Sequence, residues 1–145
     1  MKFLPLIGKR LKDDDIIEIL EYFDAVVVYD FDRLHENMPD VYWAECTKQG
    51  IVFMFDADQI LDTMFLYIVS KEGYESVEVE KIEDIELFDS SFAVESHCAT
   101  SGIECKVGRP DETKSWARID GPDKSIHYEF VGGRLSMVTI STQKN

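Results

Sequence analysis

The stretch SIHYEFVGGRLSMVTI, residues 125–140, decides the fold of this chain because a matching stretch lies 75 residues earlier. Apolar side chains alternate with polar ones up to the pair Gly132–Gly133, and a second apolar run follows. Alternation that leads into a Gly-Gly pair predicts a β-hairpin. The earlier stretch is GIVFMFDADQILDTMF, residues 50–65. The matching apolar positions are Ile51, Phe53 and Phe55 in the first stretch and Ile126, Tyr128 and Phe130 in the second.

A helix pattern precedes each hairpin. Residues 13–23 place apolar side chains at helical spacing, and one of three aspartates can cap the start. Ser90 or Ser91 can cap a second helix, which Gly102 can end. Strand patterns occupy residues 25–29, 41–46, 51–55, 60–69, 115–120, 125–130 and 134–140. Residues 30–40 are expected to form a loop, and residues 77–82 a weak strand.

The order of these patterns predicts an α+β fold in one domain, residues 1–145. We expect an antiparallel sheet with helices on one face, built from two α-β-β-β repeats at about 13–69 and 90–140. An acidic connector, 70–89, joins them. The pair Trp43-Ala44 recurs as Trp116-Ala117. One such unit is too small to bury both its helix and its sheet face, whereas two side by side can.

Composition limits the possible partners. The 29 acidic and 15 basic residues give a net charge of −14, which disfavours nucleic acid and anionic membranes and favours a basic protein or a metal ion. The chain begins without a signal-peptide pattern and has no apolar run long enough for a membrane span. Three cysteines fit no disulfide framework. We therefore expect a cytoplasmic protein.

No catalytic or metal motif stands out in the sequence. Asp56 and Asp58 match an EF-hand loop at its first two ligands only, because Leu61 and Tyr67 occupy positions that need Gly and Glu. His97 and Cys98 together with Cys105 could form half of a zinc site, but the spacing and a fourth ligand are missing. Spatial pairing of Cys98 with His127 as nucleophile and base stays open as an alternative. The expectation is a protein that is not an enzyme and holds neither cofactor nor metal.

Four motifs carry a family resemblance: LPLIGK (4–9), YDFDRLHEN (29–37), FDADQILDTMFLY (55–67) and GGRLSMVTI (132–140). They resemble small bacterial immunity proteins of contact-dependent growth inhibition and other polymorphic toxin systems. The duplicated plan is similar to the tandem-repeat fold of the beta-lactamase inhibitory protein. The resemblance implies a cytosolic protein that binds one cognate toxin, often a nuclease, and blocks its active site.

Charge and resemblance together suggest which residues would bind a basic toxin domain. The candidates are acids of three segments and two aromatic anchors: Asp30, Asp32, Glu36, Tyr42, Asp56, Asp58, Asp62, Tyr74, Glu78, Glu80, Glu83, Asp84 and Glu86. A non-catalytic structural or housekeeping interaction domain, possible as a homodimer, is the alternative.

The two repeats differ on the sheet face opposite the matching apolar residues. Val52 and Met54 are apolar there, whereas His127 and Glu129 in the second repeat suit solvent. Two interpretations stay open. Either the centre of the sheet is buried on both sides, or the first repeat exposes an apolar patch to a partner or a second copy.

Overall fold

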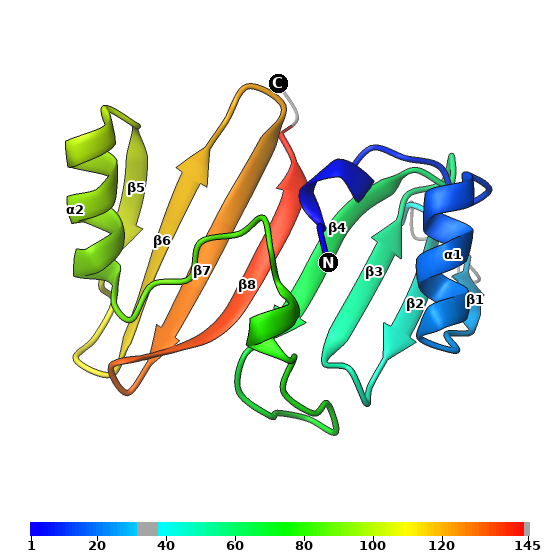
Figure 1. The fold of residues 1–145 in the computed structure, drawn as a ribbon, viewed down its shortest axis with the longest axis horizontal. Helices are drawn as coiled ribbons and strands as arrows, with labels where there is room; N and C mark the ends of the chain where they lie inside the picture. The colour runs from blue at the N-terminus through cyan, green and yellow to red at the C-terminus, as the bar shows by residue number, and fades with distance from the viewer. Residues whose placement is uncertain (32–37, 144–145) are drawn as a thin grey trace.

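A computed structural model describes residues 1–31 and 38–143 of the chain. These residues form an α+β fold around an eight-stranded antiparallel sheet with the order β1-β2-β3-β4-β8-β7-β6-β5 (Figure 1). The strands are β1 Val27–Asp30, β2 Val41–Cys46, β3 Ile51–Phe55, β4 Leu61–Tyr67, β5 Cys105–Gly108, β6 Lys114–Asp120, β7 Lys124–Val131 and β8 Arg134–Thr142. The predicted α+β class with an antiparallel sheet is thus confirmed.

Two helices lie on the same side of the sheet, α1 (Asp14–Tyr22) near β1 and α2 (Ser91–Ser101) near β5 (Figure 1). The Ser90 hydroxyl accepts a hydrogen bond from the Ala93 amide at 3.1 Å, so it caps α2 as predicted. Gly102 ends α2 with a φ of 68°, a conformation that glycine adopts without strain. Neither described helix is long and apolar enough to cross a membrane.

Two local predictions were wrong. The stretch that contains β5 was assigned to a connector, but it pairs with β6, so four strands follow each helix. Residues 77–82 form no strand; a 3-10 turn, η2 (Val79–Lys81), lies there instead. Of the apolar residues in this segment, only Val77 is buried. The segment crosses the helix side of the sheet rather than joining its edge (Figure 1).

Strands β4 and β8 join the two halves of the sheet. Their pairing aligns Met64 with Ile140 and Leu66 with Val138, and all four side chains are fully buried. The side chains that share this face form the core under the helices, among them Phe53, Ala117 and Tyr128. We call this side the covered face.

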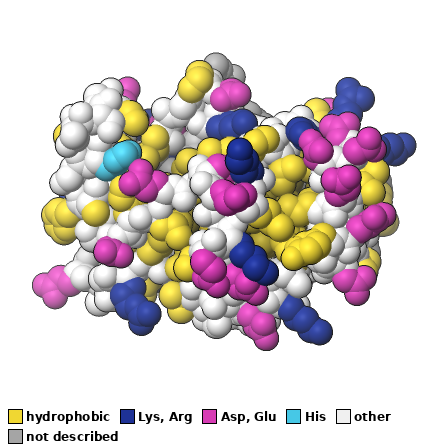
Figure 2. Space-filling model, in the orientation of Figure 1, with side chains coloured by type: hydrophobic (Ala, Val, Ile, Leu, Met, Phe, Trp, Pro, Cys, Tyr) yellow, Lys and Arg dark blue, Asp and Glu magenta, His cyan; other side chains and the backbone are white. Residues whose placement is uncertain are grey.

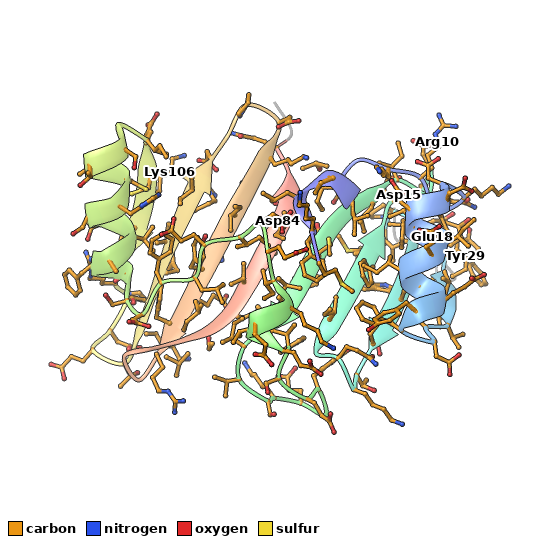
Figure 3. All side chains as sticks on the ribbon, viewed as in Figure 1. Arg10, Asp15, Glu18, Tyr29, Asp84 and Lys106 are labelled. Carbon is orange, nitrogen blue, oxygen red and sulfur yellow. The ribbon has the colours of Figure 1, made fainter. Side chains whose placement is uncertain are left out.

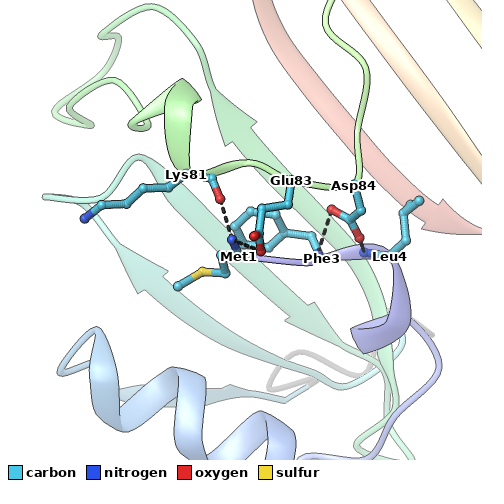
Figure 4. A network of polar contacts seen from close by, with 6 residues as sticks. All are labelled: Met1, Phe3, Leu4, Lys81, Glu83 and Asp84. Carbon is cyan, nitrogen blue, oxygen red and sulfur yellow. Dashed lines mark hydrogen bonds and ion pairs between the residues drawn. The ribbon is translucent and has the colours of Figure 1, made fainter.

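The N-terminal segment and the connector fill the covered face between the helices (Figure 1). The carboxylate of Asp84 accepts hydrogen bonds from the backbone amides of Phe3 and Leu4 at 3.0 and 2.8 Å (Figure 4). The terminal amine of Met1 donates to Glu83 at 2.5 Å and to the Lys81 carbonyl at 2.6 Å. The amine lowers the pKa of Glu83, first by this hydrogen bond and then by its charge. These contacts fix the connector over the sheet.

Candidate interaction surface

The sheet face opposite the helices is the candidate interaction surface, and we call it the open face. No helix among residues 1–31 and 38–143 covers it (Figure 1). The strand register places one row of side chains straight across it. That row consists of Glu45, Val52, Phe65, Thr139, His127, Arg118 and Lys106.

The first half of the open face is aromatic. Tyr67 and Tyr74 stack with ring centroids 4.5 Å apart and planes at 5°. Burial, followed by the nearby Glu45 carboxylate and its hydrogen bond, raises the pKa of Tyr74 to about 12, so its hydroxyl stays protonated at neutral pH. We name this half-buried cluster the aromatic platform; its members are Trp43, Met54, Phe65, Tyr67 and Tyr74.

The second half of the open face is polar. Trp116 stacks on His127 at 5.4 Å between ring centroids. Asp120 forms an ion pair with Arg118 at 2.9 Å and lies 3.9 Å from the Lys106 amine. Burial lowers the pKa of His127, the Arg118 charge lowers it further, and Glu129 opposes both. The charges here neutralise one another within the fold.

Val52 and Met54, on which the two interpretations of the first repeat depend, differ in burial. Val52 is only 4% exposed because large neighbours on the open face surround it, so the sheet is buried on both sides there. Met54 is only half-buried. In the second half His127 and Glu129 are half-buried rather than fully solvent-exposed.

The edges of the two halves differ around their tryptophans. Gly108 lies opposite Trp116, and a Cβ atom on Gly108 would stand 2.2 Å from the Trp116 indole nitrogen. The indole ring therefore lies over Gly108 and closes that edge. In the first half Val28 lies opposite Trp43, and its side chain prevents the same arrangement. A groove with a volume of about 370 Å³ remains, lined by Val26, Val28, Tyr29, Asp30, Trp43 and Glu45.

Several predicted binding acids have intramolecular partners. Asp56 accepts from the backbone amides of Asp58 and Ile60 at 2.9 and 3.0 Å, so it shapes the hairpin turn. Asp62 accepts from the Thr142 hydroxyl at 2.5 Å. Glu83 and Asp84 hold the N-terminal segment, as described above. Glu78 pairs with Lys81 at 2.9 Å, and a Glu86 carboxylate oxygen lies 3.6 Å from His97 Nε2.

The candidate residues do not form one patch. Tyr74 belongs to the aromatic platform, and Asp30 lines the groove at β1. Tyr42 stacks on Tyr29 with centroids 4.7 Å apart, on the other side of β2 from Trp43. The acids of the connector lie on the covered face, where Figure 2 shows carboxylates gathered over the connector and α1. Asp32 and Glu36 lie outside the described residues.

Sequence reasoning missed three members of the platform: Trp43, Phe65 and Tyr67. Each alternates along its strand with a fully buried neighbour, namely Ala44, Met64 or Leu66. This alternation could in principle have identified the platform residues from the sequence. In β4, however, apolar residues occupy most positions on both sides of the strand, so the sequence does not say which face is covered.

The fold separates the proposed catalytic pair. His127 lies on the open face, whereas Cys98 is buried between α2 and the covered face, so the alternative that pairs them is wrong. Burial raises the pKa of the Cys98 thiol to about 11, which disfavours the thiolate form at neutral pH. Among the described residues, no group of three or more His, Cys, Asp and Glu side chains could hold a metal ion.

The covered face contains a second hollow, about 250 Å³ in volume, between the connector, the N-terminal segment and Phe23. Figure 2 shows apolar side chains exposed between the connector and α1. The polar groups that line this hollow include Glu78 and Lys81, whose opposite charges pair with each other. The open face is therefore the stronger candidate for binding.

Comparisons with models of protein families, with curated proteins and with solved structures found no match to this chain.

Proposed function

We propose that this chain binds a basic protein and neutralises it, as a cytoplasmic immunity protein does with its toxin. The single observation that carries the proposal is the aromatic platform, which the described elements leave uncovered. Tyr and Trp side chains supply large rigid contact areas and dominate the binding energy of protein interfaces. The partner's active site would lie against the open face.

Net charge supports a basic partner. A charge of −14 exceeds what solubility of a small domain needs, which is about 2–8. Figure 2 shows acidic side chains gathered over α1 and the connector on the covered face, at a distance from the open face. Charges at that distance steer a basic protein toward the chain and raise its association rate, while the platform supplies short-range contact. A nuclease domain with a basic substrate groove is a partner that fits both the long-range charge attraction and the short-range aromatic contact.

The test is co-expression with the protein encoded by the neighbouring reading frame. We expect a complex that survives purification and protection of the host from that protein. Tyr74→Ala should weaken binding by at least about tenfold, because the rings of interface tyrosines often contribute 2 kcal/mol or more. Tyr22→Ala is the matched control, since Tyr22 is 67% exposed on α1 at the covered face. Absence of both complex and protection would contradict the proposal.

We also infer that the two halves arose by duplication of one unit. Each half has a bulge at the matching position, between Met54 and Phe55 in β3 and between Glu129 and Phe130 in β7. The matching tryptophans lie directly opposite the residues before these bulges. Related chains aligned half against half should keep the Trp-Ala pair in both halves, and relatives without that likeness would argue against duplication.

A further inference from the structure

We propose that the groove beside β1 receives an extended segment of the partner, in which basic and apolar side chains alternate and which pairs with β1 as a ninth strand. The inference rests on the proposed function, because it names the part of the open face where a basic partner would be held. It adds a recognition mode that the aromatic platform does not require, namely backbone pairing along a sheet edge.

Strand β1 has the features of an edge that accepts another strand. It pairs with β2 on one side, and no strand of the described residues pairs with its outer side. Val26 and Val28 are 74% and 57% exposed, on the same face as Trp43. Protein edges of this kind are usually protected by lysine, proline or a bulge, and residues 26–30 contain none of these.

The charges around the groove select a basic segment. Asp30 and Glu45 line it, and no Lys or Arg of residues 1–31 and 38–143 is among its lining residues. An added strand places alternate side chains on the open face, so its basic residues would reach Asp30 and Glu45 there, with their aliphatic stems against Val28 and Trp43.

The opposite edge of the sheet does not offer this site. Tyr29 and Lys106 lie at the two ends of the sheet (Figure 3). At the β5 edge the Trp116 ring already occupies the space over Gly108, and Asp120 already pairs with both Arg118 and Lys106. A basic segment would have to compete with these two cations for Asp120.

Charge also argues against a second copy of the chain as the occupant. Antiparallel pairing of two β1 strands would bring Asp30 and Glu45 of one copy close to the same residues of the other. Each copy carries a charge of −14, so long-range repulsion adds to this local cost. An extended basic segment relieves the same charges.

The test uses a blocked peptide of about eight residues with alternating lysine and valine, and a glutamate–valine peptide as its charge control. The chain contains two tryptophans, so Trp116→Phe leaves Trp43 as the sole fluorescent reporter at the β1 edge. Trp43→Phe provides the matched reporter at the β5 edge. We expect the lysine peptide to change Trp43 emission and to slow hydrogen exchange of the β1 amides at least about tenfold, while Trp116 emission stays constant.

Two variants separate backbone pairing from simple attraction. Val28→Lys should weaken binding of the lysine peptide at least about tenfold, while Val131→Lys, at a site 48% exposed on β7, should not. Asp30→Asn combined with Glu45→Gln should weaken it by about fivefold at low salt, because exposed ion pairs contribute a few-fold each. Glu104→Gln is the charge control.

The inference is overturned if the lysine peptide fails to bind at millimolar concentration, if both peptides bind equally, or if Val28→Lys leaves the affinity unchanged. It is also overturned if the chain sediments as a dimer that Val28→Lys dissociates, since the occupant would then be a second copy. These results are distinct from the Tyr74→Ala result. Loss of partner binding in Tyr74→Ala with normal binding in Val28→Lys would preserve the proposed function alone.

Discussion

The two halves of the open face place different chemistry on the same backbone. In the first half Trp43 lies opposite Met54 and next to Val28, and in the second half Trp116 lies opposite Glu129 and next to Gly108. The Trp116 ring packs entirely within its own half, where it lies over Gly108 and stacks on His127. Trp43 lines an open groove instead. The difference teaches that an aromatic side chain becomes available to a partner when its own sheet leaves it without a complete set of contacts.

Of the variants that test this difference between the halves, one that fills the space over Gly108 should change the unfolding free energy most. Gly108→Val would force the Trp116 ring off its position, and such overpacking costs about 1–3 kcal/mol of unfolding free energy. Denaturant titration should show the loss, and Trp116 emission should shift to longer wavelength. Val28→Thr is the control at the matching position and should change stability by less than about 0.5 kcal/mol. Equal effects at the two sites would mean that the halves do not differ as described.

Exchanging the residues opposite the tryptophans should have an intermediate effect. Met54→Glu puts a carboxylate between Trp43 and buried Thr63, and it should cost about 1–2 kcal/mol because the charge loses part of its hydration. Glu129→Met should change stability by less than about 0.5 kcal/mol, since Trp116 and Met137 lie opposite this one position and can pack against an apolar side chain. Thermal or chemical unfolding of the two variants measures both values. A cost for Glu129→Met that matches the cost for Met54→Glu would contradict the assignment of an apolar first half and a polar second half.

The smallest effect concerns pH and His127. Its pKa in the folded chain lies below the ordinary value of about 6.5, chiefly because of burial. As pH falls below about 6.5, the unfolded chain takes up this proton first, so stability decreases until the pH is below the folded pKa. His127→Gln should remove this part of the pH dependence between pH 7 and 5. An imidazole titration by NMR with a midpoint at or above 6.5 in the folded chain would refute the prediction.

The sequence predicted elements well where local patterns decide them. Hairpins with a clear turn, and helix α2 with its capping serine and terminal glycine, were found at their correct places. β5 was missed because its four residues, Cys105–Gly108, become a strand only by pairing with β6. The open face could not be read from β4, where apolar side chains point to both sides. The sequence also could not show which acids form contacts inside the fold instead of facing solvent. Asp84, for example, accepts hydrogen bonds from two backbone amides that lie about 80 positions away in the chain.

The β4–β8 junction has a consequence for synthesis of the chain on the ribosome. Phe65 can pair with Thr139 only after the 74 residues that follow Phe65, about half of the chain, have been synthesised. The hairpins within each half can form as soon as they emerge. Until β8 is made, β4 presents an unpaired apolar edge to the cell. Slowing translation between these two strands should therefore lengthen the period in which the nascent chain can aggregate or engage a chaperone.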